Sequence, residues 1–218
     1  MARLESELFN YKSHYENDGV LINDFNITDK SELDKKERTN TTARLALLYL
    51  KPSLALKDNM RKFSLEHYLN IHKFLFDGIY PFAGIIRDEP IQKEIPFCLP
   101  QLIYNNLNDT LNKMNKYSDR ITNRDELLDF ITYYFAEVDV IHPFREGNGR
   151  CEREFFRQYV IDICEKNNLD NYYLDFSLID NKDDFINAVV DADACIDSDK
   201  LRNIFDNILV SEEKKLRR

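Results

Sequence analysis

Residues 142–153 read His-Pro-Phe-Arg-Glu-Gly-Asn-Gly-Arg-Cys-Glu-Arg, and this stretch decides how the chain around it folds. Its proline and two glycines interrupt helical geometry, whereas apolar residues at gaps of three and four stand on both sides. The stripes are Leu127, Ile131, Tyr134, Phe135, Val138 and Ile141 before it, and Phe155, Phe156, Tyr159, Val160, Ile163 and Cys164 after it. The pattern predicts two helices joined by a loop, the second beginning near Asn148.

Helical spacing recurs over most of the 218 residues. Further apolar stripes end at Lys51-Pro52, follow a capping Ser64, and run from Leu201 to Leu209. Glycine is scarce, with 5 in the chain, which disfavours the many tight turns of a β-sandwich or barrel. The sequence therefore predicts one all-α domain.

Segment 84–98 is the exception to this helical pattern. It carries two prolines and short patches of alternating hydrophobicity. We expect a small β-hairpin or extended flap here, the only candidate sheet edge in the chain. A plain surface connection is the alternative interpretation.

The charge, cysteine spacing and apolar runs of the sequence disfavour several classes of protein function. The net charge of −9, from 30 basic and 39 acidic residues, disfavours a nonspecific nucleic-acid-binding surface. The four cysteines, none in C-x-x-C spacing, disfavour a zinc site. No apolar run is long enough to span a membrane, and none resembles a signal peptide. We expect a cytoplasmic protein with reduced thiols, and a secreted effector stays open as the alternative.

The loop in 142–153 leads into a helix N-terminus, where free backbone N–H groups and the helix dipole favour anions. Gly147 and Gly149 let the backbone approach a phosphate closely. Arg150 and Arg153 stand three residues apart on one helix face, and two guanidinium groups there suit the phosphates of a nucleotide. Taken alone, a Gly-x-Gly is usually a turn and an Arg-rich face is usually solvated.

Glu146 and His142 add chemistry to the same loop. A carboxylate beside phosphates fits if Mg²⁺ bridges them, since Mg²⁺ takes one or two carboxylates plus phosphate oxygens. A histidine can accept a proton from an attacking hydroxyl. Each residue alone is more often structural, as we expect for His67 and His72, but their combination within twelve residues supplies the parts of phosphoryl or nucleotidyl transfer.

The run 142–153 resembles the motif of the Fic family, H-x-F-x-[DE]-G-N-G-R-x-x-R, at every defining position. Tyr80-Pro-Phe-Ala-Gly84, followed by Arg87, Ile91 and Lys93, is similar to the family segment that leads into its flap, where Trp often replaces Phe82. The resemblance spans about residues 30–190. It implies a Fic helical bundle with a β-hairpin flap over residues 31–194. Outside it, where the resemblance is weak, we expect a helical extension over 1–30 and a C-terminal helix over 195–218 that packs on the Fic domain.

The resemblance also implies roles for the residues that match the motif. His142 is the expected general base for a Tyr, Ser or Thr hydroxyl, Glu146 the expected Mg²⁺ ligand, and Phe144 the expected anchor of the loop. The expected ATP-binding residues are Gly147, Asn148 and Gly149 around the α- and β-phosphates, Arg150 at the β-phosphate and Arg153 at the γ-phosphate. The expected target-docking flap comprises Ile85, Ile86, Ile91 and Lys93.

The implied activity is transfer of AMP from Mg-ATP to a target protein, with release of pyrophosphate. A kinase-like relative has Lys where Gly149 stands here, so the glycine favours AMP transfer over phosphate transfer. A catalytically silent Fic-fold binding protein is one alternative. Another family reaction, namely de-AMPylation or phosphocholine or UMP transfer, is the other.

Many members of the family carry an inhibitory helix with the pattern [ST]-x-x-x-E-[GN]. Thr28 and Thr122 begin partial matches here, but Leu follows the glutamate in both. The resemblance therefore implies the toxin of a bacterial toxin–antitoxin pair, inhibited in trans by a small antitoxin that supplies the glutamate.

Overall fold

The computed structural model describes residues 13–92, 96–194 and 197–211. The helices are α2 (Lys30–Leu50), η1 (Pro52–Ala55), α3 (Leu65–Phe76), α4 (Pro100–Ser118), α5 (Arg124–Asp139), α6 (Asn148–Asn167), η2 (Phe176–Leu178), α7 (Lys182–Asp193) and α8 (Asp199–Ile208). The strands are β1 (Glu16–Asn17), β2 (Val20–Leu21), β3 (Tyr172–Leu174) and β4 (Leu209–Ser211). The expected all-α class with a small hairpin is confirmed.

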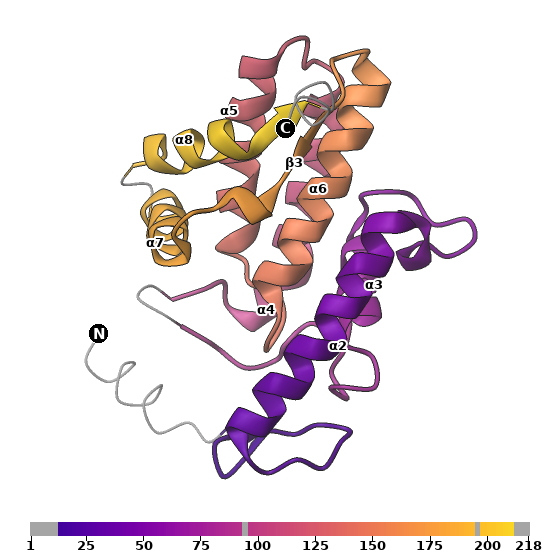
Figure 1. The fold of residues 1–218 in the computed structure, drawn as a ribbon. Helices are drawn as coiled ribbons and strands as arrows, with labels where there is room; N and C mark the ends of the chain where they lie inside the picture. The colour runs from indigo at the N-terminus through magenta and orange to yellow at the C-terminus, as the bar shows by residue number, and fades with distance from the viewer. Residues whose placement is uncertain (1–12, 93–95, 195–196, 212–218) are drawn as a thin grey trace.

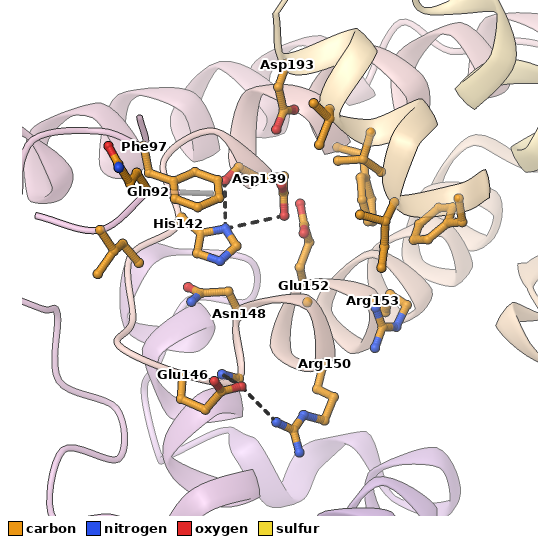
Figure 2. Close-up of a pocket in the computed structure, with 18 of the residues that line it drawn as sticks. Gln92, Phe97, Asp139, His142, Glu146, Asn148, Arg150, Glu152, Arg153 and Asp193 are labelled. Atoms are coloured by element: carbon orange, nitrogen blue, oxygen red, sulfur yellow. Dashed lines mark hydrogen bonds and ion pairs between the residues drawn. The ribbon is translucent and has the colours of Figure 1, made fainter. Parts of the chain in front are cut away.

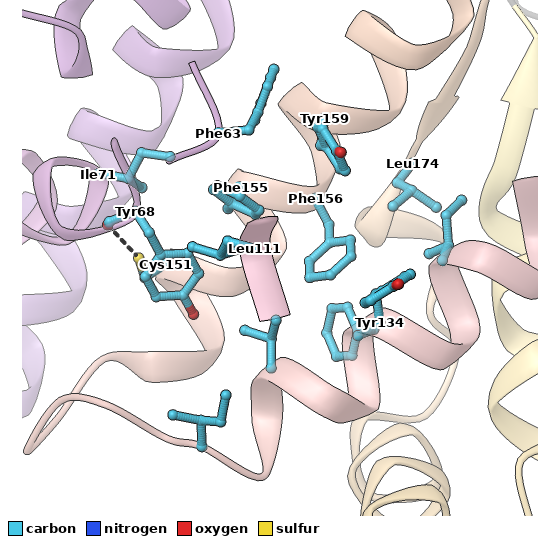
Figure 3. Close-up of a cluster of buried hydrophobic side chains, with 14 of the residues drawn as sticks. Phe63, Tyr68, Ile71, Leu111, Tyr134, Cys151, Phe155, Phe156, Tyr159 and Leu174 are labelled. Atoms are coloured by element: carbon cyan, nitrogen blue, oxygen red, sulfur yellow. Dashed lines mark hydrogen bonds between the residues drawn. The ribbon is translucent and has the colours of Figure 1, made fainter. Parts of the chain in front are cut away.

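Helix α6 lies at the centre of the bundle. In Figure 1, α2 and α3 lie on one side of α6 and α5, α7 and α8 on the other. Phe155 packs edge-on against Tyr68 of α3 at 5.0 Å between ring centroids, and Phe156 packs against Phe135 of α5 at 5.1 Å. Figure 3 shows this aromatic core around the first turns of α6. The helix that follows the loop is therefore buried on two sides, which fixes where its N-terminus points.

Local sequence signals account for the helix boundaries. The Ser64 side chain accepts a hydrogen bond from the His67 backbone N–H and so caps α3, as predicted. Helix α2 ends at Leu50, just before Lys51-Pro52. Helix α6 begins at Asn148, as predicted, after Gly147 adopts a left-handed conformation.

Helix α4 was not predicted, although its signal is present in the sequence. Its buried residues, at helical spacing, are Ile103, Leu107, Thr110, Leu111 and Met114. Most of the remaining positions are polar, so the mean hydropathy of the segment is low, and the exposed Leu102 and Tyr104 lie outside the buried stripe. The stripe is recognisable only when the segment is read at a period of 3.6 residues.

The described residues near both ends of the chain depart in part from the expected helices. The described part of the expected helical extension, residues 13–29, forms the β1–β2 hairpin and loops, while residues 1–12 lie outside the described range. Asp18 and Gly19 have φ values of 49° and 78°, which is the geometry that Asp-Gly favours in a tight hairpin turn. Helix α8 packs on α5, through Phe205 against Phe135, but then gives way to β4 paired with β3. Residues 212–218 lie outside the described range.

The prediction that segment 84–98 provides the only sheet edge is wrong, because the described residues form two strand pairs outside it. Among its described residues the only pairing is an isolated antiparallel bridge between Gln92 and Pro96. The two described ladders, β1–β2 and β3–β4, lie elsewhere. The prolines at 90 and 96 remove backbone donors, which limits the ladder that the described residues can form. No helix in the described ranges is long and apolar enough to cross a membrane.

His67 of α3 is a buried histidine that makes the stability of the protein depend on pH. It is buried, and its Nδ1 accepts a hydrogen bond of 3.1 Å from the Phe63 backbone N–H. Burial, with a smaller contribution from the Lys62 charge, lowers the pKa of His67 from 6.5 to about 4. The folded state therefore excludes a proton that the unfolded chain binds below pH 6.5.

We expect this histidine to make the protein less stable in acid. Its contribution is intact above pH 6.5 and is lost as the pH falls toward 4, amounting to about 2 kcal/mol at pH 5. Urea unfolding at pH 7 and pH 5 measures the loss, and His67→Gln should lose about 2 kcal/mol less than the wild type between the two. Equal losses in both proteins would contradict the assignment.

Candidate active site

Phe144 anchors the loop between α5 and α6. Its ring is fully buried and stacks on His72 at 3.7 Å between ring centroids, with Tyr68 at 5.9 Å. The Asn148 side chain closes the turn, because its Oδ1 accepts from the Phe144 N–H and its Nδ2 donates to the Phe144 carbonyl, both at 2.8 Å. The amide of Asn148 is thereby held within the loop through its oxygen and one of its two N–H donors.

Gly147 occupies a position that no other residue fits. Its φ is +85°, and a Cβ there would lie 2.2 Å from Cζ of Phe76. At Gly149 the nearest atom to such a Cβ is Nη1 of Arg153, at 3.1 Å. A side chain at 147 would therefore displace the loop from the core, and one at 149 would press on the Arg153 guanidinium.

His72 joins this loop to the segment that begins at Gly84. Its Nδ1 accepts a hydrogen bond of 2.9 Å from the Gly84 N–H, so Nε2 carries the proton and donates to the Glu146 carbonyl at 2.9 Å. Burial lowers the pKa of His72 to about 3, which keeps the ring neutral. His72 therefore has a structural role, as expected, because it positions the backbone of Glu146.

Arg87 makes a second connection between the same two segments. Its side chain is 1% exposed, and its Nε donates to the His142 carbonyl at 2.8 Å. The two Nη groups donate to the carbonyls of Glu89 and Cys98, and the Arg87 N–H donates to Pro143 at 2.9 Å. Burial lowers the pKa of Arg87 to about 10. The guanidinium is therefore held by carbonyl dipoles, and it joins Glu89 and Cys98 to the His142 backbone.

His142 is held rigidly from both sides. Its backbone is left-handed, with φ of 46°, and its ring stacks on Phe97 at 3.8 Å between ring centroids. Nδ1 lies 3.2 Å from the Asp139 carbonyl and 3.6 Å from Asp139 Oδ1, as Figure 2 shows. Because both neighbours are acceptors, they select the tautomer of the neutral ring in which Nδ1 carries the proton and Nε2 the lone pair.

The seven motif residues expected to act in chemistry line one cavity of about 380 Å³. They are His142, Glu146, Gly147, Asn148, Gly149, Arg150 and Arg153. Helix α7 forms the opposite wall with Phe185, Ile186, Val189 and Val190. The cavity thus has one polar, cationic side at the start of α6 and one apolar side.

The expected flap residues are only partly at this cavity. Ile91 lines it, whereas Ile85 is exposed and lines a separate groove beside α3. Ile86 is partly buried against the hydrophobic core. Lys93 lies outside the described residues. The structure therefore brings one of the four, Ile91, to the cavity.

The two motif arginines have different surroundings. Nη1 of Arg150 donates to Glu37 Oε1 at 2.5 Å and its Nη2 to Glu146 Oε1 at 3.2 Å. Tyr80 also donates its hydroxyl to Glu37. Arg153 forms no ion pair within the described ranges, and burial lowers its pKa. Arg150 is thus held in place by α2, while the Arg153 guanidinium remains available.

Glu146 fits a Mg²⁺ ligand that acts together with phosphate. Its side chain is 42% exposed in the cavity, and its Oε1 accepts from the Gly147 N–H at 2.8 Å. Among the described residues, no group of three or more His, Cys, Asp or Glu side chains is arranged so that it could hold a metal ion by itself. One carboxylate is sufficient when phosphate oxygens and water complete an octahedral shell.

Comparison with known proteins agrees with this arrangement. The Fic/DOC family model matches residues 62–160. The probable protein adenylyltransferase y4lH of Sinorhizobium fredii is 32% identical over 139 residues, which cover 62% of this chain and 68% of that protein. The chain belongs to the Fic/DOC family.

A second Fic relative and a solved Fic structure extend the comparison. The probable protein adenylyltransferase Fic of Escherichia coli is 27% identical over 144 residues, which cover 65% of this chain and 68% of that protein. The crystal structure of BepC from Bartonella tribocorum, with bound AMPPNP, has a TM-score of 0.74 at 20% identity. The alignment covers 93% of this chain and 99% of that one, so the two share the Fic fold.

Sequence reasoning missed three carboxylates and one ring at the site. Asp139, Glu152 and Asp193 line the cavity beside His142, and Phe97 stacks on it. Asp139 and Glu152 stand at variable positions around the Fic motif, and Asp193 lies in an acidic stretch that resembles a solvated helix surface. Their proximity to His142 follows from the packing of α5, α6 and α7.

Gly147→Ala should destabilise the protein by about 3 kcal/mol, from left-handed backbone strain and overpacking against Phe76. Gly78→Ala is the matched control. Gly78 also has a positive φ, of 68°, but open space surrounds its Cβ position, so we expect a loss of about 1 kcal/mol. Urea unfolding of the two variants measures the difference, and equal losses would show that Phe76 yields without cost.

Proposed function

We propose that this Fic protein transfers AMP from ATP to a hydroxyl side chain of another protein. The observation that carries the proposal is that one cavity is lined by His142, whose Nδ1 is bound to Asp139, by the N-terminus of α6, and by two arginines. The Escherichia coli and Sinorhizobium relatives are named as probable protein adenylyltransferases, and BepC holds AMPPNP. These names and that ligand support the same reaction for this chain.

In the proposed reaction, His142 Nε2 accepts the proton of the target hydroxyl. The hydroxyl oxygen attacks the α-phosphorus of ATP and forms a new P–O bond. The bond from the α-phosphorus to the bridging oxygen breaks, and pyrophosphate leaves with the electron pair. The products are the AMP-modified target, pyrophosphate and a proton held on His142.

The start of α6 stabilises the charge that moves in this step. The backbone N–H groups of Asn148 and Gly149 belong to the first turn of α6, where helix geometry favours an anion, whereas the Gly147 N–H donates to Glu146 Oε1. Arg150 and Arg153 would contact the β- and γ-phosphates, which favours departure of pyrophosphate. Glu146 would hold Mg²⁺, which neutralises charge on the phosphate oxygens when it is bound.

The flap would hold the target. Ile91 stands at the edge of the cavity, and Gln92 and Pro96 form the bridge that begins the flap. An extended target segment that pairs with this edge would bring its hydroxyl near His142, the mode known as β-augmentation. Contacts from Arg87 support this geometry, because they fix the base of the flap on the His142 loop.

We also propose that a separate small protein inhibits this enzyme in trans, as in a toxin–antitoxin pair. Arg153 supports this proposal, because it lines the cavity without an ion pair to any described residue. A carboxylate from a partner would pair with it and exclude the γ-phosphate. Arg150 is a poorer receptor, since Glu37 and Glu146 already occupy its two Nη groups.

The position of the label in ATP tests the reaction. With bacterial lysate as target source, ATP labelled at the α-phosphate should label protein and ATP labelled at the γ-phosphate should not. His142→Ala should lower the labelling at least a hundredfold, since it removes the base. Transfer of the γ-label would show a kinase, and equal labelling by His142→Ala would show that His142 is not the base.

A variant of α2 separates internal from external inhibition. If restraint comes in trans, the purified wild type is active and Glu37→Gln is less active. A roughly tenfold loss in kcat/KM for ATP is expected, because a hydrogen bond to a charged group contributes about 1.5–3 kcal/mol. Glu32→Gln, an exposed glutamate on the same helix, is the control and should have wild-type kinetics. A silent wild type that Glu37→Gln activates would show that Glu37 itself is the inhibitor.

A further inference from the structure

Three carboxylates from three helices converge behind His142. Asp139 ends α5, Glu152 lies in the first turns of α6, and Asp193 ends α7, and Figure 2 shows the Asp139 and Glu152 groups facing each other. Glu152 is 1% exposed and the Asp139 side chain 14%. Carboxylates buried this closely cannot all be ionised, because like charges in a poorly solvated site repel strongly.

The groups that contact Asp139 and Glu152 indicate which of these two carboxyl groups holds a proton. Asp139 Oδ1 lies 3.6 Å from the protonated Nδ1 of His142, a contact that favours the ionised aspartate. No hydrogen bond from the described residues reaches Glu152 Oε1. That oxygen therefore lacks the donors that an ionised glutamate would require.

The directions of the pKa shifts of the two carboxyl groups agree with this placement. Burial and the nearby Asp139 charge raise the pKa of Glu152 well above its usual range. Burial also acts to raise the pKa of Asp139, but hydrogen bonds from His142 and Glu152 outweigh it and lower that pKa to about 2. Asp193 adds negative charge from α7, and Arg153 offsets part of it from α6.

We infer that Glu152 is a protonated acid that donates to ionised Asp139, and that this pair positions His142 by accepting its Nδ1–H. The pair makes Nε2 the proton acceptor that faces the cavity, and its single negative charge stabilises the imidazolium that forms when a hydroxyl is deprotonated. Asp139 and Glu152 are thus positioning residues. The inference rests on the proposed function only for the identity of the base, since the proton arrangement belongs to the free protein.

Two substitutions separate the charge from the hydrogen bond. Asp139→Asn keeps an oxygen that can accept from His142 Nδ1 but removes the negative charge. Glu152→Gln keeps a donor toward Asp139, because its amide N–H replaces the acid proton. Glu152→Ala removes that donor, so the conservative glutamine should restore what the alanine variant loses.

Carboxyl and imidazole NMR of the full chain without nucleotide tests the pair independently of any activity. The Glu152 carboxyl signal should remain that of a neutral acid between pH 5 and 8, with the exposed Glu165 of α6 as the reference for a solvated carboxylate. The His142 titration midpoint should move about one unit lower in Asp139→Asn and stay in place in Glu152→Gln. An ionised Glu152 at pH 7, or an unmoved midpoint in Asp139→Asn, would overturn the inference.

The pH profile of AMP transfer gives the second readout. The ascending limb of kcat/KM should follow the imidazole, about one unit lower in Asp139→Asn, and Glu152→Gln should retain more of the rate than Glu152→Ala. If no AMP transfer occurs while the NMR result holds, the proposed reaction fails and the carboxyl pair stands. If transfer occurs with profiles that none of these substitutions moves, the reaction stands and the positioning role fails.

Discussion

A neutral imidazole, that of His72, connects the pieces of chain from which the site is built. It accepts from the Gly84 N–H, donates to the Glu146 carbonyl, and stacks on Phe144. Protonation would turn the acceptor nitrogen into a second donor facing Gly84, so burial of the neutral ring is a condition for this geometry. The loop, the base of the flap and α3 are therefore positioned by one side chain that has no role in the chemistry.

This constraint explains why the loop can hold unfavourable backbone conformations. His142 and Gly147 both have positive φ, and a non-glycine residue in that region costs about 1–2 kcal/mol. Arg87 offsets this cost at His142, since its Nε and backbone N–H bind the carbonyls of His142 and Pro143. The strain is useful because the bend directs the His142 ring into the cavity while its backbone remains tied to the flap.

The sequence predicts the loop and its flanking helices well, for physical reasons that are local. Pro143, Gly147 and the apolar stripes act within a few residues, so the start of α6 at Asn148 could be predicted directly. The hydrogen bonds that His72 and Arg87 donate to the loop, at the Glu146 and His142 carbonyls, span 74 and 55 positions of the sequence. No rule based on local spacing predicts contacts between residues so far apart. The same holds for Asp139 and Glu152, which become neighbours only because α5 and α6 pack side by side.

The distribution of charge around the cavity connects these elements to the reaction. A chain with a net charge of −9 repels a nucleotide overall, so attraction has to come from the local field of the α6 N-terminus, Arg150 and Arg153. Ionised carboxylates behind His142 would weaken that field, because they line the same cavity. A proton retained by Glu152 removes one of those charges, while Asp139 keeps the single charge that orients the base. The same buried proton therefore serves both nucleotide binding and proton acceptance, because both depend on the number of negative charges beside His142.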